Sequence, residues 1–223
     1  MTNFVMLVGP HRYRLTQQAL ESLAAHTDLT SLTCTFVLDT ADDWRTEQLI
    51  ESFADTHANC TALMVRHSGH TLSQLKNLGV AWSEQRFGRG DWLYLSDSDV
   101  YFMPDWLKIL TDAAAQSQDQ NYDLWGGQCH PFHHEPLQVL DGPSWLITWR
   151  CWDDCGPFDR TTAPGVCRSE EYPFCQRLLA GGGKIGVIHP HVVIHTGLTH
   201  LNGADAPGHK ERELLIPKGV VAL

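Results

Sequence analysis

Residues 91–99 read Asp-Trp-Leu-Tyr-Leu-Ser-Asp-Ser-Asp, an apolar run that ends in two carboxylates, Asp97 and Asp99. The run at 92–95 is typical of a strand buried on both faces, and open α/β sheets bind ligands at the carboxyl ends of such strands. Two carboxylates one residue apart repel each other unless a cation intervenes, and oxygen ligands suit Mg²⁺ or Mn²⁺. The pattern therefore predicts a divalent-cation site at a sheet edge. A solvated acidic turn is the competing interpretation, because Asp and Ser also favour turns.

The first half of the chain alternates between strand and helix patterns. Apolar runs predict strands at residues 4–8, 33–38, 60–65 and 92–95. Between these runs, apolar residues recur every three or four positions, which is the helical period. Such alternation predicts a mostly parallel sheet with helices on both faces. Polar residues follow three of the strands and are expected to converge along one sheet edge: Pro10, His11 and Arg12; Asp39, Asp42 and Asp43; Asp97 and Asp99.

The second half has a less regular order, and we expect it to belong to the same single domain. The patterns predict a helix with Pro104 in its first turn, strands at about 122–126 and 145–150, a helix at 170–180 and a strand at 184–188. Gly181-Gly182-Gly183 follows the second of these helices, and we interpret it as a helix C-cap and not as a phosphate loop. Residues from about 198 onward are interpreted as a loop or lid.

Charge and hydropathy narrow the class of protein. The formal net charge of −10 disfavours broad attraction to nucleic acid or to an anionic membrane, because that attraction depends on Lys and Arg. The apolar run at residues 4–8 is too short to cross a membrane and lacks the basic segment and cleavage site of a secretory signal. We therefore expect a cytoplasmic protein without a membrane segment.

Seven cysteines, an odd number, indicate reduced thiols and not a secreted disulfide framework. A structural zinc site is the alternative interpretation of the later ones. Its ligands would be Cys151, Cys155, Cys167 and Cys175, although their spacing lacks the paired knuckles of most such sites.

Taken together, these segments resemble the nucleotide-sugar-dependent glycosyltransferases of the GT-A fold, especially those of family 2. The resemblance extends over nearly the whole chain, and it implies a Rossmann-like domain in which residues 1–99 bind the donor while residues 100–223 bind the acceptor and carry catalysis. The matches that carry it are Gly9-Pro10-His11-Arg12 after the first strand, Asp39 after the second, Asn77-Leu78-Gly79 ahead of the acidic stretch, and a late block with Gly156-Pro157-Phe158-Asp159, Ser169-Glu170-Glu171-Tyr172, Arg177, Gly183-Lys184-Ile185 and Val193-Ile194-His195.

The resemblance implies metal-dependent transfer of a sugar from a UDP-sugar. Asp97, Asp99 and His195 would hold Mn²⁺ or Mg²⁺, and the metal would bridge the donor diphosphate and neutralise the leaving group. By itself, the position of Asp39 also fits a turn at the end of a strand. The donor-binding residues that the family implies, besides Asp97, are Pro10 and Arg12 in the base pocket, Asp39 on the uracil or ribose, and Lys76, Asn77 and Ser98.

The resemblance also implies a catalytic residue. Family members often carry Glu-Asp where this chain has Glu170-Glu171, and the second acid is the general base of inverting members. Glu171 is therefore the candidate base and Glu170 the reserve, whereas an ordinary acidic helix start is the competing interpretation. Lys76 stands where many members have Arg. Trp125-Gly126-Gly127 is similar to a segment of retaining GT-A enzymes, so both anomeric outcomes stay open.

The acceptor is expected to be a soluble hydroxyl compound, such as a saccharide, and the transferred group a hexose or N-acetylhexosamine. Trp125, Trp149 and Arg150 are the candidate acceptor-binding residues, because aromatic rings stack on sugars. One alternative is a phage-type enzyme that glycosylates a hydroxymethylated pyrimidine in DNA, and another is a nucleotide-sugar-binding module without catalysis. Action on DNA predicts one positive surface formed by Arg150, Arg160, Arg168 and Lys184.

Overall fold

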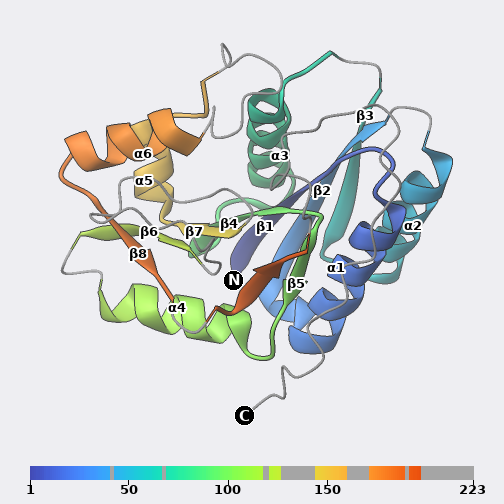
Figure 1. The fold of residues 1–223 in the computed structure, drawn as a ribbon, viewed down its shortest axis with the longest axis horizontal. Helices are drawn as coiled ribbons and strands as arrows, with labels where there is room; N and C mark the ends of the chain where they lie inside the picture. The colour runs from blue at the N-terminus through green and yellow to red at the C-terminus, as the bar shows by residue number, and fades with distance from the viewer. Residues whose placement is uncertain are drawn as a thin grey trace.

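The computed structural model describes residues 1–40, 43–66, 69–117, 121–126, 144–159, 171–188 and 191–196. A seven-stranded sheet in the order β3-β2-β1-β4-β7-β6-β8 runs through the molecule (Figure 1). Its strands are β1 (Thr2–Val8), β2 (Leu32–Thr40), β3 (Cys60–Arg66), β4 (Trp92–Asp97), β6 (Tyr122–Gly126), β7 (Ser144–Ile147) and β8 (Lys184–Val187).

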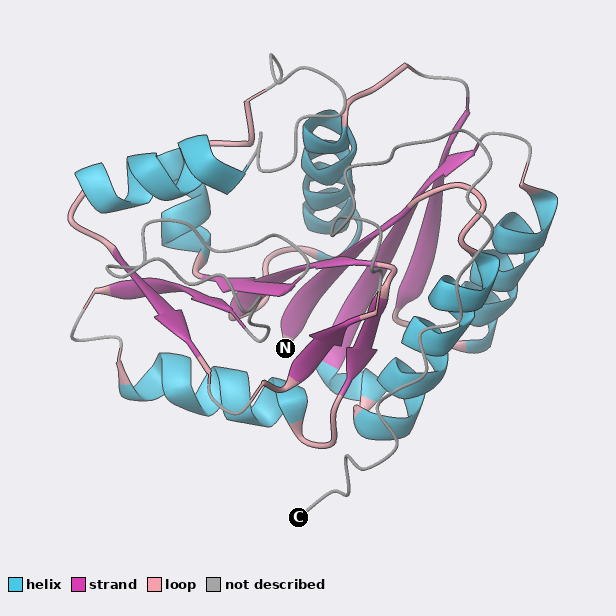
Figure 2. Cartoon of the chain, in the orientation of Figure 1, coloured by secondary structure: helices cyan, strands magenta, loops and turns pink. Residues whose placement is uncertain are grey.

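Helices lie on both faces of this sheet (Figure 2). One face carries α1 (Tyr13–His26), α2 (Trp44–Thr56) and α4 (Trp106–Gln116), and the other carries α3 (Leu72–Phe87), α5 (Trp149–Cys155) and α6 (Glu171–Ala180). A short 3-10 helix, η1 (Leu29–Ser31), precedes β2. The predicted α/β architecture, with helices on both faces of a mostly parallel sheet, is confirmed.

Alternation along β1 explains why each face has its own core. Phe4, Met6 and Val8 pack into the cluster beneath α1, α2 and α4, while Val5 and Leu7 pack into the cluster beneath α3, α5 and α6. Successive side chains of a strand point to opposite faces, and a strand covered on both faces is therefore apolar throughout. The same alternation holds in β4, so both central strands are buried on both faces.

Gly79 allows α3 to lie close against the sheet. A Cβ atom at this position would come within 2.5 Å of the Val37 side chain and 2.6 Å of the Val5 side chain. Real Cβ atoms do not approach so closely, so a larger residue would push the helix away. The first turns of α3, which begin after the capping box of Thr71 and Gln74, are thereby kept near the carboxyl edge of β1 and β2.

The strands from β1 to β4 are parallel to one another, and Leu7 of β1 pairs with Asp97 of β4. Strand β7 is antiparallel to both of its neighbours, β4 and β6. The predicted strand at 145–150 was too long at its end. The side chain of Thr148 accepts a hydrogen bond from Cys151 N at 3.0 Å and starts α5 there.

Two helix boundaries test the sequence interpretation. Helix α4 begins at Trp106, after Pro104 and a left-handed Asp105 (φ 59°), so these two residues precede the helix and do not form its first turn. Helix α6 ends at Ala180, where Gly181 N donates to Arg177 O and Gly182 has a φ of 81°. The triple glycine is therefore a helix C-cap, as predicted.

A second, two-stranded sheet joins segments far apart in the chain. Strand β5 (Val100–Phe102) pairs antiparallel with β9 (Val193–His195), so that Val100 lies opposite His195. Both strands pack on the α1 side of the main sheet. Among the described residues, none of the helices combines the length and the apolar character that a membrane span requires.

Candidate active site at the carboxyl edge of the sheet

The acidic stretch lies at the carboxyl end of β4 and continues into β5. Asp97 is the last residue of β4, and its side chain is 31% exposed, whereas the side chain of Asp99 is only 2% exposed. Ser98, between them, is buried as well. The stretch is therefore not a solvated acidic turn, because the fold takes one of its two carboxylates into the interior.

Pairing of β5 with β9 brings the late histidine beside this carboxylate. Thr196 N donates to Asp99 O at 2.7 Å, and His195 Nε2 lies 3.2 Å from Asp99 Oδ2. The His195 side chain is 12% exposed. Two residues far apart in the sequence thus share a buried polar contact at the edge of the main sheet.

The charge of Asp99 is neutralised from two sides. Arg12 Nη1 lies 2.5 Å from Asp99 Oδ2, the oxygen that also faces His195. Burial alone would raise the pKa of Asp99, but the hydrogen bond and charge of His195 and the charge of Arg12 lower that pKa to about 2. Burial likewise works to lower the pKa of His195, and the hydrogen bond and charge of Asp99 outweigh it, so the pKa of His195 is raised.

The other oxygen of this carboxylate, Asp99 Oδ1, is buried and has no hydrogen-bond partner among the described residues. A buried anionic oxygen without a donor is costly, so this atom suits a cation. The 3.2 Å between Asp99 Oδ2 and His195 Nε2 is close to the roughly 3 Å between neighbouring ligand atoms of a cation with bonds of about 2.1 Å. Asp99 and His195 therefore fit a shared divalent cation.

Asp97 does not complete a three-ligand cluster in this structure. Its Oδ1 lies 3.6 Å from Lys76 Nζ, on the side of α3. Within the described part of the chain, no group of three His, Cys, Asp or Glu side chains is arranged so that it could hold a metal ion.

Lys76 links the acidic stretch to the start of α6. Its side chain is 5% exposed, and its Nζ lies 3.6 Å from Asp97 Oδ1 and 3.9 Å from Oε1 of Glu171, the first residue of α6. The Glu171 side chain is 12% exposed. The ammonium also lies 5.8 Å from the ring centre of Phe158, within cation–π range. Glu170 lies outside the described residues.

Asn77 binds the protein backbone in this structure. Its Nδ2 donates to Phe158 O at 2.9 Å, and its Oδ1 accepts from Phe158 N at 3.0 Å. Both polar groups of the amide thus hold the residue whose ring covers Lys76. The sequence interpretation missed this contact, because nothing in the spacing of residues 77 and 158 indicates it.

Arg177 of α6 anchors the same segment. Its Nε donates to Cys155 O at 2.5 Å, its Nη2 donates to Pro157 O at 3.0 Å, and its Nη1 binds Asp159 at 2.9 Å. We call residues 155–159 the anchored segment. Sequence analysis included Arg177 only as part of the family pattern and assigned it no role.

The loops after β1 and β2 meet at the same edge. His11 has a left-handed backbone (φ 59°), and its N–H donates to Asp43 Oδ2 at 2.7 Å. Asp43 also caps α2, because its carboxylate accepts from the Thr46 hydroxyl at 2.6 Å. Pro10 lies in the first loop, and Asp39 is half-buried near the end of β2. Asp43 is a further residue that sequence analysis placed only in a polar loop, since a helix-capping signal does not reveal a contact with another loop.

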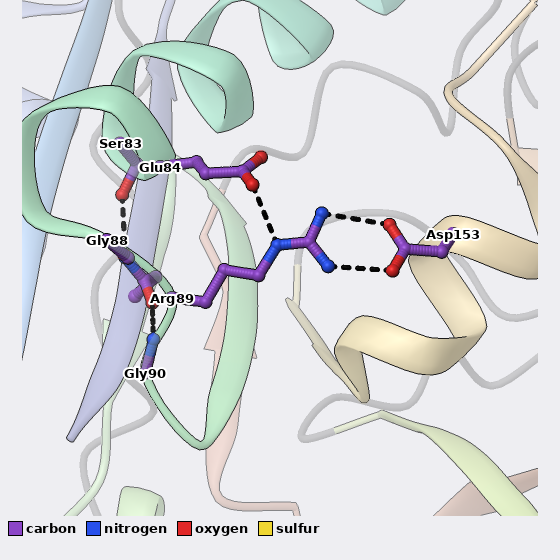
Figure 3. Close-up of polar contacts among 7 residues, drawn as sticks. Ser83, Glu84, Gly88, Arg89, Gly90 and Asp153 are labelled. Carbon is purple, nitrogen blue, oxygen red and sulfur yellow. Dashed lines mark hydrogen bonds and ion pairs between the residues drawn. The ribbon is translucent and has the colours of Figure 1, made fainter.

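The candidate acceptor residues lie in different settings. Trp149 is 8% exposed, and the Arg89 guanidinium covers its ring at 4.6 Å (Figure 3 shows the other contacts of Arg89). Arg150 is largely exposed and donates to Asp123 at 2.7 Å. Trp125 is half-buried, and its ring lies against Tyr122.

The described contacts give little support to two alternatives, DNA binding by a basic surface and a zinc site formed by cysteines. Lys184 lies over the Tyr122 ring at 5.3 Å, while Arg160 and Arg168 lie outside the described residues. Cys151, Cys155 and Cys175 are free thiols, and the sulfurs of the first two lie 3.8 Å apart. Cys167 lies outside the described residues.

Comparison with known proteins agrees with this architecture. The sequence matches no family model and no curated protein. The mannosyltransferase PcManGT from Pyrobaculum calidifontis, solved with GDP-Man and Mn²⁺, superposes with a TM-score of 0.67 at 12% identity, covering 89% of this chain and 57% of its own. TarS 1–349 of S. aureus, solved with UDP-GlcNAc, superposes with a TM-score of 0.60 at 18% identity, covering 86% of this chain and 57% of its own.

These similarities concern the fold. The chain has the GT-A fold, as its sequence predicts, and it spans 57% of the length of each of these two proteins.

Proposed function

We propose that this protein is a glycosyltransferase that moves a sugar from a nucleoside diphosphate sugar to a hydroxyl acceptor. The observation that carries the proposal is that two contacts lie at the carboxyl end of β4, that of Asp99 with His195 and that of Lys76 with Glu171, with Asp97 bound to Lys76 between them. Two carboxylates, an imidazole and a buried ammonium from four separate segments are the groups that this reaction needs. The fold, shared with PcManGT and TarS, supports the proposal.

A divalent cation, Mn²⁺ or Mg²⁺, would be held by Asp99 and His195, with Asp97 as the third ligand. It would supply positive charge for the leaving diphosphate. The unpartnered Oδ1 of Asp99 and the short distance between Asp99 and His195 support this assignment. The backbone of Ser98, between the two aspartates, would lie next to the bound donor.

Glu171 would act as the general base. The acceptor hydroxyl attacks the anomeric carbon, its proton passes to the Glu171 carboxylate, and the carbon–oxygen bond to the diphosphate breaks with its electron pair on the leaving group. Lys76 Nζ, 3.9 Å from Glu171 Oε1, would help to hold this carboxylate in position. A single base of this kind implies inversion at the anomeric carbon, so the configuration of the product tests the assignment.

The donor would bind to the first half of the domain, residues 1–99. Pro10 and Asp39 would contact the base and ribose of a uridine nucleotide, and Lys76 would contact the phosphates from its buried position. The transferred group would be a hexose or an N-acetylhexosamine. Asn77 would contribute through the anchored segment, since its amide is bound to Phe158.

The acceptor would be a saccharide or another soluble hydroxyl compound bound by the second half. Trp125 is partly exposed, which suits stacking on a sugar. Of the basic residues that DNA binding would require, Arg150 is paired with Asp123 and Lys184 lies on Tyr122. No described contact therefore favours DNA over a saccharide.

The test is release of nucleotide from a panel of UDP- and GDP-sugars, with and without acceptors, in Mn²⁺ or in excess chelator. Asp99→Asn should lower turnover by at least about 100-fold, because metal-ion charge stabilisation is worth several kcal/mol. Asp91→Asn is the matched control, since Asp91 precedes the same strand at its opposite end and binds the N-terminal ammonium. Equal activity of Asp99→Asn and wild type, undiminished by chelator, would refute the proposal. Transfer of the sugar to hydroxymethylated DNA, and to none of the saccharides tested, would identify DNA as the acceptor instead.

A further inference from the structure

Arg12 makes the closest contact to the buried carboxylate of the proposed metal site. It is the residue immediately before α1, and its Nη1 lies 2.5 Å from Asp99 Oδ2. The Arg12 side chain is 35% exposed, whereas Asp99 is 2% exposed. The guanidinium therefore reaches inward from the donor-side loop to an anion in the interior.

This contact neutralises a charge that the interior does not tolerate alone. An unpaired buried carboxylate is strongly unfavourable, and Asp99 receives its positive partners from Arg12 and His195 on a single oxygen. Asp99 and His195 would hold the divalent cation, and Arg12 Nη1 already lies 2.5 Å from the Asp99 oxygen that faces His195. Arg12 and the cation would therefore compete for Asp99, because they would occupy neighbouring space and repel each other as like charges.

The backbone of Arg12 is fixed, while its side chain can turn. The neighbouring His11 is held by Asp43, and Arg12 O accepts the first helical hydrogen bond of α1 from Thr16 N at 2.9 Å. Rotation about the side-chain bonds, with one third of the side chain exposed, is enough to carry the guanidinium away from Asp99. Its planar fork matches two phosphate oxygens at once, and the donor diphosphate would lie beside the same carboxylates.

We propose that Arg12 is an exchangeable counter-ion, which competes with the divalent cation for Asp99 and then binds the diphosphate of the donor. The proposal rests on the proposed function for the metal. It gives Arg12 a role at the phosphates, in place of the role in the base pocket that the family resemblance implies. It also makes cation and donor cooperative, because the donor stabilises the position that Arg12 takes when it leaves Asp99.

The test is Mn²⁺ binding in the absence of nucleotide, measured by the loss of the free-ion electron paramagnetic resonance signal. Removal of the competing charge in Arg12→Met should tighten Mn²⁺ binding about 5- to 100-fold, the usual range of coupling between two ligands. At saturating Mn²⁺ the same variant should bind UDP at least about tenfold more weakly, because the diphosphate loses its bidentate partner. Arg14→Met is the matched control, since it removes the same charge from an exposed position on α1.

Arg12→Gln keeps a hydrogen-bond donor but removes the charge, and it decides the question if Arg12→Met does not fold. Mn²⁺ binding that is unchanged or weaker in the folded variant, while Asp99→Asn abolishes it, would overturn the counter-ion role and leave the metal site intact. Absence of Mn²⁺ binding in wild type and in the Arg12 variants would instead overturn the metal site, and the counter-ion role with it. If the Arg12 variant binds Mn²⁺ more tightly but binds UDP as well as wild type does, the proposed binding of Arg12 to the donor diphosphate is wrong.

Discussion

The two edges of the central sheet use charged residues in opposite ways. At the amino edge, Arg89 binds both oxygens of Asp153 at 2.7 and 2.9 Å and Glu84 at 2.8 Å, and all three side chains are more than one third exposed (Figure 3). At the carboxyl edge, Asp99 is almost fully buried, and one of its oxygens has no partner among the described residues. In the first arrangement the charged groups bind one another, whereas in the second one oxygen of Asp99 is left to bind a ligand.

This difference separates stabilising charges from those proposed to act on a substrate. Exposed pairs contribute little free energy and are replaceable, because water competes for every charge. Buried charges with incomplete partners are costly, and proteins retain them chiefly at functional sites. Substitutions at the carboxyl edge should therefore change sugar transfer, whereas substitutions at the amino edge should change only the stability of the fold.

The largest effect is expected at Glu171. Glu171→Gln should lower turnover by about two to four orders of magnitude while donor and Mn²⁺ binding stay near wild type, because the amide keeps the shape but cannot accept the proton. Glu84→Gln, a change of the same kind at the amino edge, should leave turnover unchanged. Steady-state kinetics with titration of UDP and Mn²⁺ measures both variants. A silent Glu171→Gln together with an inactive Glu170→Gln would transfer the role to Glu170.

A smaller loss is expected when Arg177 is removed from the anchored segment. Arg177→Met should reduce kcat about 10- to 100-fold with little change in KM, because displacement of Phe158 and Lys76 by an ångström would misplace the catalytic groups. Arg89→Met removes an arginine that also makes three side-chain hydrogen bonds, at the other edge, and should leave kcat unaltered. Equal fractional losses of kcat in the two variants, matched by equal losses of stability, would reduce Arg177 to a structural residue.

A dependence on pH should appear at the carboxyl edge through His195. Its pKa in the folded protein is raised above the ordinary 6.5, so its pair with Asp99 stabilises the protein fully below that pH and is lost as the pH rises through the folded pKa. In excess chelator the melting temperature should therefore fall as the pH is raised from 6 toward alkaline values, and His195→Gln should lack this component. Mn²⁺ affinity should change in the opposite direction, by up to about tenfold per pH unit, because the cation needs the neutral imidazole. Parallel melting curves for wild type and His195→Gln across this range would contradict the assignment.

The smallest effect belongs to the amino edge. Arg89→Met should lower the free energy of unfolding by about 1 kcal/mol, the sum expected for exposed ion pairs and a cation–π contact with Trp149. Urea denaturation measures this change, and sugar transfer should be unaltered. A loss of transfer in a fully folded Arg89→Met protein would break the distinction between the two edges.

Some features of this protein follow from the sequence alone. Apolar runs and helical spacing predict the order of the first strands and helices, because burial on a sheet imposes a local period that a single segment displays. The end of the apolar run at Asp97 and Asp99 places these carboxylates at a sheet edge for the same reason. The triple glycine predicts a helix end, because the left-handed conformation that Gly182 adopts there is set by the local backbone and favours glycine.

Other features depend on the tertiary structure. The reversed direction of β7, the contact of His195 with Asp99, the position of Lys76 between Asp97 and Glu171, and the binding of Arg12 to Asp99 join segments separated by about 20 to 100 residues. Sequence patterns report which face of an element is buried, but not which distant element covers it. Those contacts arise only when the sheet and its pairing β5–β9 assemble, because pairing and packing across the whole chain set the distances between side chains that the chain itself keeps far apart.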